Sequence, residues 1–449
     1  MRSICIYQKL KYVNIEANVY IIYTKMIIDI LNEIVNCSKL ADQIKMTQIN
    51  KNTHNNIYIH SLRAPEFMGQ KVLYQNKFSR LTELRCEYNC EIHDISHLAD
   101  TLKLLSCMYY SAINQKNILG LKYLKKLYCN GNEKITNVNH LKDTLEELNC
   151  SENHCGITQN GISELKNLKS LFCWNNKKIN NAHHFKDTLE ILHCEGACGI
   201  DQNGVSELRK LKILRCCRNT KITNVNHLRD SLEQLECGWY SGIDQNGISQ
   251  LKYLELLNCE YNHKIVNVDH LAGTLKWFNC TKSDMIGQSE IANLKNLEEL
   301  NCCSTPNISN VNHLKATLKR LYCGGSDCGI DQQGISEIEN IELLYCRDNE
   351  KIIDVSHMNK TLRILHCGGS SGINQKSILK LTHLCHLNCG HNSTITDVNH
   401  LKNTLKMLGC DGSPCGIDQK GICELRNMTH IEYTFNEKII NTKDFLSKK

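Results

Sequence analysis

Sixteen cysteines recur along this chain of 449 residues at intervals of 21 to 23 residues. They are Cys86, Cys107, Cys129, Cys150, Cys173, Cys194, Cys216, Cys237, Cys259, Cys280, Cys302, Cys323, Cys346, Cys367, Cys389 and Cys410. A fixed period of this length is typical of a repeat protein, in which each unit stacks on its neighbours to bury a shared core. Because there are only 3 prolines and no Gly/Ser-rich or Pro-rich linker, we expect one continuous architecture.

The residues around each of these ladder cysteines follow one pattern. Leucine stands two residues before the cysteine in every unit except that of Phe278, and five residues before it in every unit except that of Ile341. Side chains alternate along a strand, so the leucine and cysteine of L-x-C point inward and the residue between them points outward. The pattern predicts short parallel strands with buried cysteines, which serve as small apolar residues of the core.

The units alternate between two forms and make a double repeat of 43 or 44 residues. Odd units carry Asn three residues after the cysteine, as at Asn132, and continue as I-x-x-V-x-H-L, which favours a tight turn or 3₁₀ segment. Even units mostly lose this Asn and read G-I-D-Q-N-G-I-S-E-L, where Asp244 can open a turn and Gly247 can relieve backbone strain. Backbone groups in the turns of even units must therefore be satisfied differently.

The pattern resembles the leucine-rich repeat, with cysteine in place of its third leucine, over residues 81 to about 446. The resemblance implies an α/β repeat solenoid: a horseshoe or arc with a parallel sheet on the concave face and short turns, 3₁₀ or α segments on the convex face. Sixteen repeats occupy residues 81–427, and the unit at 428–449, with Tyr433 at the cysteine position, is interpreted as the C-terminal cap. The L-x-C variant is most similar to the F-box/leucine-rich-repeat-like proteins of amoeba-infecting giant DNA viruses.

Residues 26–80 lack the period and place apolar residues at helical spacing. Two interpretations stay open, a helical module that resembles an F-box and a cap that covers the first repeat. The F-box resemblance rests on Ile30, Leu31, Ile34 and Val35. It implies that these residues bind the adaptor subunit of a cullin-type ubiquitin ligase, although the proline of the family pattern is absent. Residues 1–25 are interpreted as a leader, with Met26 as an alternative start.

No sequence motif indicates catalysis. The chain has no P-loop, dinucleotide-binding, H-E-x-x-H or G-x-S-x-G motif. Ladder cysteines on a flat sheet point the same way, so they are poorly placed to surround a zinc ion. The histidines of the I-x-x-V-x-H-L segments are two turns apart and are interpreted as turn residues that bond to backbone. We therefore expect no catalytic residue, no metal and no other cofactor.

Charge and hydropathy restrict the partners. The net charge of +6 is spread over the chain rather than gathered in a basic segment, which does not predict a nucleic-acid partner. No uncharged apolar stretch is long enough to span a membrane. We expect an intracellular protein, in the host cytoplasm if the source is viral.

Binding is predicted on the outward face of the strands. The aromatic and imidazole side chains beside the ladder cysteines are Tyr128, Phe172, Trp174, His193, Trp239, Tyr322, Tyr345 and His366. Rigid rings among neutral Asn side chains are favoured in protein interfaces, and the first four of these residues are expected to form one patch. The hypothesis is a non-enzymatic scaffold that binds a protein partner, such as a host protein, as an F-box-like substrate receptor. A plain binding module and a structural or metal-binding thiol-rich protein are the alternatives.

Overall fold

The computed structural model describes residues 58–440, which divide into two compact units, 58–179 and 180–440. The strands of the first unit are β1 (Ser61–Arg63), β2 (Glu83–Arg85), β3 (Leu104–Ser106), β4 (Lys126–Tyr128), β5 (Glu147–Asn149) and β6 (Ser170–Phe172). Its helices are α5 (Gln70–Leu73) and α6 (Gln115–Ile118), with 3₁₀ helices η2 (Asn76–Phe78), η3 (Ser96–Leu98), η4 (Asn139–Leu141) and η5 (Gln159–Gly161).

The second unit repeats the same alternation of strand and short helix. Its strands are β7 (Ile191–His193), β8 (Ile213–Arg215), β9 (Gln234–Glu236), β10 (Leu256–Asn258), β11 (Trp277–Asn279), β12 (Glu299–Asn301), β13 (Arg320–Tyr322), β14 (Leu343–Tyr345), β15 (Ile364–His366), β16 (His386–Asn388), β17 (Met407–Gly409) and β18 (His430–Glu432). Its α-helices are α7 (Gln202–Val205), α8 (Gln245–Ile248), α9 (Gln288–Ile291) and α10 (Gln375–Ile378). Its 3₁₀ helices are η6 (His183–Phe185), η7 (Asn226–Leu228), η8 (Asp269–Leu271), η9 (Asn312–Leu314), η10 (Gln333–Ile335), η11 (Ser356–Met358), η12 (Asn399–Leu401) and η13 (Lys420–Ile422).

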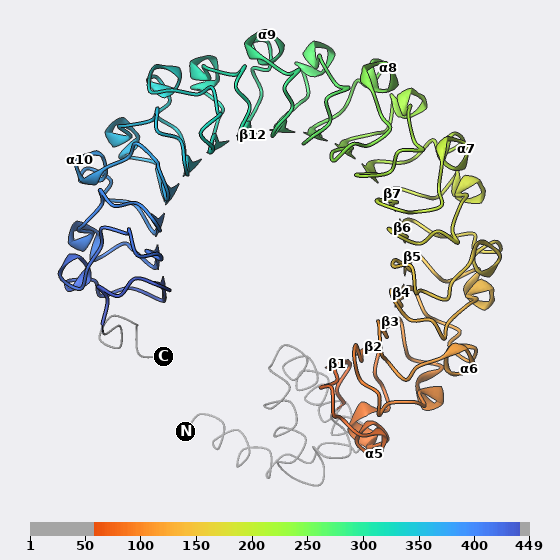
Figure 1. The fold of residues 1–449 in the computed structure, drawn as a ribbon. Coiled ribbons are helices and arrows are strands. Elements are labelled where there is room, and N and C mark those ends of the chain that lie inside the picture. The colour runs from red at the N-terminus through yellow and green to blue at the C-terminus, as the bar shows by residue number, and fades with distance from the viewer. Residues whose placement is uncertain (1–57, 441–449) are drawn as a thin grey trace, which may run out of the picture. The chain divides into compact units, whose positions relative to one another are not determined.

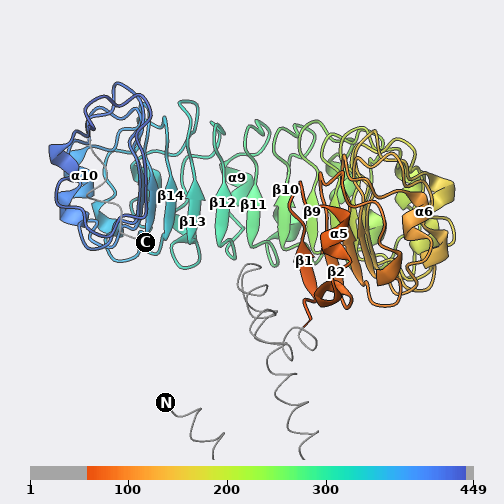
Figure 2. The same ribbon diagram turned by 90° about the horizontal axis from the view of Figure 1, so that it is seen from below.

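Within each unit consecutive strands pair in parallel and in register, so that the leucines of neighbouring L-x-C segments face one another, as Leu344 faces Leu365. The second unit curves, with its strands on the concave side and its helices on the convex side (Figure 1). Figure 2 shows strands β9 to β14 side by side. This is the leucine-rich-repeat solenoid that the sequence pattern predicts. None of the helices in residues 58–440 is long and apolar enough to cross a membrane.

The ladder cysteines lie in the core, as predicted. All sixteen are buried and carry free thiols. The leucines two residues before them are also buried, while the residues between leucine and cysteine are mostly half-exposed. The alternation of L-x-C therefore separates a buried column from an outward column on every strand.

The two forms of unit build two kinds of convex turn. In odd units I-x-x-V-x-H-L forms a 3₁₀ helix such as η7, with Ile222, Val225 and Leu228 buried. Most even units form an α-helix, such as α8, which is capped by Asp244, whose carboxylate accepts from the Gly247 N–H at 2.9 Å, while η5, η10 and η13 are the 3₁₀ helices of the other even units. Gly247 does not relieve strain as expected, because its φ is not positive. Glycine is required because a Cβ would collide with the carbonyl oxygen of Thr223.

The asparagine of odd units satisfies backbone groups of the preceding turn. The side-chain N–H groups of Asn132 donate to the carbonyls of Cys107 at 2.9 Å and Ile113 at 3.0 Å, and its oxygen accepts from the Lys134 N–H at 2.9 Å. The same pattern recurs at Asn176, Asn219, Asn262, Asn349, Asn392 and Asn436. These buried amides tie their odd units to the even units before them, and in the unit of Cys302 the Thr305 hydroxyl makes the bond to the Cys280 carbonyl instead.

Even units replace this amide with a thiol or hydroxyl. The thiol of Cys155 donates to the Cys129 carbonyl at 3.5 Å, and Cys328 and Cys415 make the equivalent bonds at 3.6 and 3.7 Å. In the unit of Cys280 the hydroxyl of Ser283 donates to the Cys259 carbonyl at 2.9 Å. The thiols of Cys328 and Cys415 thus take the place of a missing asparagine, whereas the unit of Cys155 keeps Asn153, whose side chain is exposed.

The repeats begin earlier than the sequence analysis placed them. Strand β1 pairs in parallel with β2, with Leu62 opposite Leu84, so this strand of the sheet lies within the segment assigned to the N-terminal module. This unit has no ladder cysteine, so the sequence pattern did not reveal it, but Leu62 is buried like the ladder leucines and extends the core by one strand. The expected leader (1–25) and the adaptor-binding Ile30, Leu31, Ile34 and Val35 lie outside the described residues.

Candidate functional site

The expected binding residues occupy two kinds of position. Tyr128, Phe172, His193, Tyr322, Tyr345 and His366 stand on the outward face of strands β4, β6, β7, β13, β14 and β15, one residue before the ladder cysteine. Trp174 and Trp239 instead lie beyond the ends of their strands, in the turns that follow the cysteines. All eight side chains are half-buried, which is the state of a surface residue held by its neighbours.

In the first unit Tyr128 and Phe172 do not lie on adjacent strands. The Tyr128 hydroxyl donates to a Glu147 carboxylate oxygen at 2.6 Å, and the Arg85 guanidinium lies 5.8 Å from the ring centroid. Burial and this carboxylate raise the pKa of Tyr128. Phe172 is two strands away from Tyr128, with Asn149 on the strand between them. His193 belongs to the second unit, so the single patch of four residues stays a prediction.

In the second unit four rings follow one another across adjacent strands. The ring centroids are 6.1 Å apart for Tyr322 and Tyr345, 5.6 Å for Tyr345 and His366, and 4.8 Å for His366 and His386. Gly324 has no side chain, and a Cβ there would lie only 2.6 Å from the Tyr345 ring. The Tyr345 ring therefore packs directly against the backbone of the turn at Gly324. We call Tyr322, Tyr345, His366 and His386 the aromatic run.

A second outward column, three residues before each ladder cysteine, was missed by the sequence analysis. Beside the aromatic run it contributes the half-buried Leu343, Ile364 and His386, and Met407, which is 39% exposed. The signal was present, because residues three before and one before the cysteine share the outward face of a strand. With this column the aromatic run becomes a mixed aromatic and apolar surface over β13 to β17.

The histidines of this surface are held in the neutral form. Burial, with the neighbouring His386, lowers the pKa of His366, and burial, with His430, lowers that of His386. On β7, burial and the charge of Arg215 lower the pKa of His193 to about 4. Neutral imidazoles present apolar faces and hydrogen-bonding groups without a charge that would have to be desolvated on binding.

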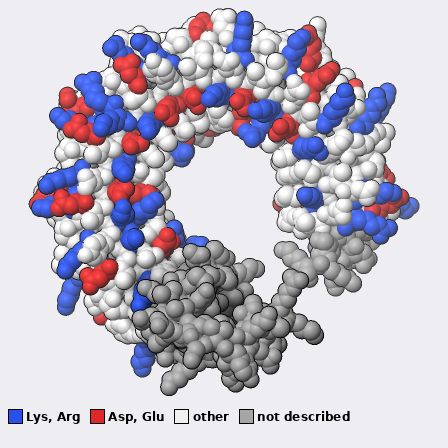
Figure 3. Space-filling view, turned by 180° about the vertical axis from the view of Figure 1, so that it is seen from behind, with Lys and Arg blue, Asp and Glu red and all other residues white. Residues whose placement is uncertain are grey.

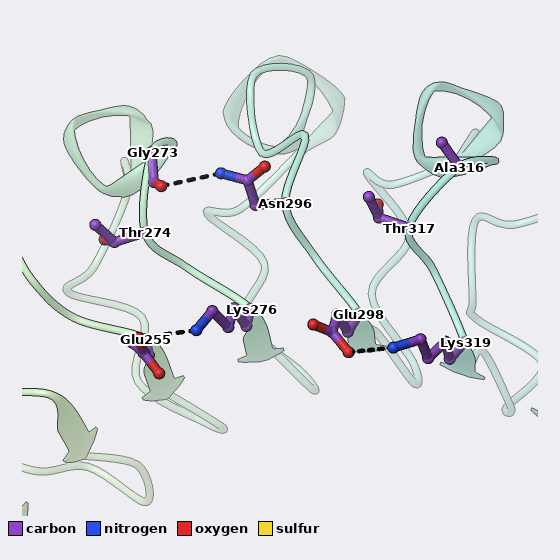
Figure 4. A pocket seen from close by; sticks show the side chains of 9 residues that line it. All are labelled: Glu255, Gly273, Thr274, Lys276, Asn296, Glu298, Ala316, Thr317 and Lys319. Carbon is purple, nitrogen blue, oxygen red and sulfur yellow. Dashed lines mark hydrogen bonds and ion pairs between the residues drawn. The ribbon is translucent and has the colours of Figure 1, made fainter.

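Charged side chains line the rim where the chain enters the strands. In a shallow groove of about 540 Å³ before β10 to β13, Lys276 pairs with Glu255 at 2.9 Å and Lys319 with Glu298 at 2.6 Å (Figure 4). Acidic and basic side chains interleave along the inner edge instead of separating into patches of one sign (Figure 3). Such an edge does not provide the continuous basic track that a phosphate backbone requires.

The convex histidines bond to backbone, as interpreted from the sequence. The Nε2 atom of His227 lies 2.9 Å from the Val205 carbonyl of the preceding turn, and the bond recurs at His140, His270, His313, His357 and His400. At His97 burial lowers the pKa, and the weaker effects of Asp94 and the Leu73 carbonyl oppose this shift. His184 contacts the Phe185 ring.

The thiols form a structural column rather than a reactive site. Burial raises the pKa of Cys86 and Cys346 to about 12. Three thiols outside the ladder are exceptions. Hydrogen bonds from the Cys129 and Cys302 thiols lower the pKa of Cys155 and Cys328, and the hydrogen bond from the Cys389 thiol lowers that of Cys415 to about 7. Across residues 58–440 no three His, Cys, Asp or Glu side chains are grouped so that they could hold a metal ion.

No protein-family model matches the sequence, and no curated protein matches it. Among solved structures, the chain is similar to the functional domain of InlJ from Listeria monocytogenes, which includes a cysteine ladder, with 22% identity over 79% of this chain and 74% of that chain and a TM-score of 0.43. It is similar to TLR13 in a complex with ssRNA13, with 18% identity over 89% of this chain and 61% of that chain and a TM-score of 0.44. Similarity to the yeast Rad7 and Elc1 complex has 13% identity over 98% and 97% of the two chains and a TM-score of 0.43. These are similarities of fold alone.

Proposed function

We propose that the chain is a non-enzymatic scaffold that binds a protein partner on the concave face of its second unit. The aromatic run carries this proposal, because four rings in successive contact on adjacent strands form a rigid surface with little side-chain entropy to lose on binding. Leu343, Ile364 and Met407 add apolar area beside the rings. Such a combination of aromatic anchors with polar neighbours is typical of interface hot spots.

The test compares concave and convex substitutions in the full chain. A photo-crosslinking amino acid in place of Tyr345 should capture a defined partner from native extracts, and the same amino acid in place of the convex Lys402 should not. Replacing Tyr322, Tyr345 and His366 with Ala should then weaken binding of the purified partner by about 30-fold or more, the equivalent of losing one hot spot. The control variant, Lys315→Ala with Lys402→Ala, should bind normally. Loss of binding in the control alone would assign the function to the convex face.

We further propose that the N-terminal module connects this scaffold to a cullin-type ubiquitin ligase. The proposal is supported by the helical spacing of Ile30, Leu31, Ile34 and Val35 in the sequence. Ile30→Asp with Ile34→Asp should abolish co-purification with the adaptor subunit while far-ultraviolet circular dichroism of the repeats is kept. If the unmodified chain does not bind the adaptor, the segment is a cap and the chain is a plain binding module.

A further inference from the structure

One turn position has the same unusual backbone conformation in every unit. The residue two positions after each ladder cysteine, or after Tyr433 in the last unit, has a positive φ. These residues are Tyr88, Tyr109, Gly131, Glu152, Asn175, Gly196, Arg218, Trp239, Tyr261, Lys282, Ser304, Gly325, Asp348, Gly369, His391, Gly412 and Phe435. Glycine adopts this left-handed region without a steric cost, and Asn or Asp tolerates it, so the five glycines suit the fold best.

Large aromatic residues are costly at this position. Trp239 and Tyr261 both have a φ of 55°, and Tyr240 has a φ of 62°. A bulky residue in the left-handed region is strained by about 1–2 kcal/mol, and its side chain offers no local hydrogen bond in return. The fold imposes the positive φ on every unit, but glycine would adopt it without strain, so the aromatic residues add a cost that the fold does not require, and such strain is found mainly at functional sites. The rings at these turns therefore serve a purpose other than folding.

The side chains of four successive turns form one continuous stack. The Arg218 guanidinium lies 4.7 Å from the Trp239 ring centroid, the Trp239 and Tyr261 rings stack at 4.3 Å, and the Lys282 ammonium lies 5.1 Å from the Tyr261 centroid. The backbone beneath is tied from turn to turn, since the Trp239 N–H donates to the Glu260 carbonyl at 2.6 Å and the Tyr261 N–H to the Thr281 carbonyl at 3.0 Å. We call Arg218, Trp239, Tyr261 and Lys282 the turn column.

The charges of the turn column indicate the chemistry of its partner. In the described part of the chain, neither Arg218 nor Lys282 forms a salt bridge with a carboxylate, although many other exposed cations of the repeats do. The faces of both rings are already covered by their neighbours in the stack, so a nucleotide base cannot insert between them. The ring edges, the adjacent Tyr240, which is 62% exposed, and the exposed cations of Arg218 and Lys282 remain accessible to acidic groups. The hydrogen bond with Tyr261, with a weaker effect of Asp327, raises the pKa of Lys282.

We propose that the turn column is a docking ridge for an acidic protein segment. Carboxylates of the segment pair with Arg218 and Lys282, and an apolar side chain between them packs against Trp239, Tyr240 and Tyr261. The proposal extends the scaffold function to a surface separate from the aromatic run, so each can fail without the other. The carboxylate of Glu260, the residue directly before Tyr261, would repel an acidic segment and attract a basic one.

Selection from a random peptide display library on the full-length chain tests this proposal. Enriched peptides should carry at least two carboxylates around an apolar residue, and their binding should weaken at least 10-fold in 0.5 M NaCl, which screens ion pairs. Arg218→Gln with Lys282→Gln should weaken binding at least 10-fold, and because glutamine is also an unbranched residue with a Cβ, the backbone strain at these two positive-φ positions should be unchanged. Glu260→Gln should leave binding unchanged or strengthen it.

Trp239→Gly separates binding from folding. Glycine fits the positive φ of this position, so the melting temperature should be unchanged or higher while peptide binding is lost. Tyr109→Gly is the matched control, because Tyr109 has a φ of 54° and stacks on Tyr88 at 5.2 Å in the first unit; its peptide binding should be unchanged. The proposal is overturned if no peptide is enriched, if enriched peptides bind Trp239→Gly normally, or if they are basic and weakened by Glu260→Gln. Binding of a single-stranded oligothymidylate that depends on Trp239 would also overturn it.

Discussion

Asn262 offers the sharpest test of how the turns are held together. Its side chain is 1% exposed, donates to the carbonyls of Cys237 at 2.9 Å and Ile243 at 3.0 Å, and accepts from the Lys264 N–H at 3.1 Å. Asn262→Ala removes all three bonds and leaves three buried backbone groups without this partner. Since an unsatisfied buried group costs roughly 1–3 kcal/mol, we expect the free energy of unfolding to fall by about 3 kcal/mol or more.

Urea unfolding followed by circular dichroism and tryptophan fluorescence measures this effect. The midpoint should shift while the slope of the transition stays the same, because the surface exposed on unfolding is unchanged. Asn262→Thr should lose less, since Thr305 occupies the equivalent position in its own unit and its hydroxyl donates to the Cys280 carbonyl at 3.0 Å. Asn427→Ala, which removes one exposed bond to Asn403, should change stability by no more than about 0.5 kcal/mol. If Asn262→Ala costs no more than this control, the asparagines do not hold the turns.

Three further predictions concern thiols and pH. Cys367→Ser should lower the free energy of unfolding, measured in urea, by about 1–3 kcal/mol. Cys216→Ser should lower it less, because the hydroxyl of Ser241, which bonds to the Cys216 thiol, can pair with the new serine. A thiol reagent added to the native chain should modify the exposed Cys90 and Cys423 well before the ladder thiols, because the ladder thiols are buried and burial raises the pKa of a thiol such as Cys86. Rapid labelling of the ladder cysteines, detected by mass spectrometry, would contradict the buried column. Burial lowers the pKa of most convex histidines below the value of about 6.5 that they have in the unfolded chain. The unfolded state therefore binds more protons, and the free energy of unfolding should fall as the pH drops below about 6.5. His227→Gln should reduce this dependence on pH, and an unchanged dependence would exclude a contribution of His227.

The strands and the core followed from the sequence because they depend on local alternation. L-x-C alone determines which side chains are inward, and I-x-x-V-x-H-L has the spacing of a tight turn, so both appear where the pattern places them. The role of Cys155 could not be read in this way. It lies 26 residues after Cys129 in the chain but only one turn away in space. The bond from the Cys155 thiol to the Cys129 carbonyl forms only when the turns are stacked.

The candidate site was predictable only in part for a similar reason. Tyr322, Tyr345 and His366 recur at one position of the repeat, so their alignment on one face follows from the period. Trp239 was assigned to the strand face because it lies close to Cys237 in the chain. The direction of the Trp239 side chain depends on the positive φ two residues after the cysteine. The residues at this position range from glycine to tryptophan, so the residue type does not predict a positive φ there.

The alternation of amide and thiol bonds also determines how such a chain can gain or lose length. Asn262 bonds to the even unit before it, while Ser283 bonds to the odd unit before it, and this alternation is interrupted at the unit of Cys302, where the Thr305 hydroxyl donates to the Cys280 carbonyl. Excising residues 216–258, one odd and one even unit, would join Cys259 to the turn of Cys194 with every type of bond preserved. Excising a single unit would set two asparagine turns or two thiol turns against each other. Length changes in steps of 43 or 44 residues keep the order of the two forms, so we expect the pair, rather than the single repeat, to be the module that is gained or lost.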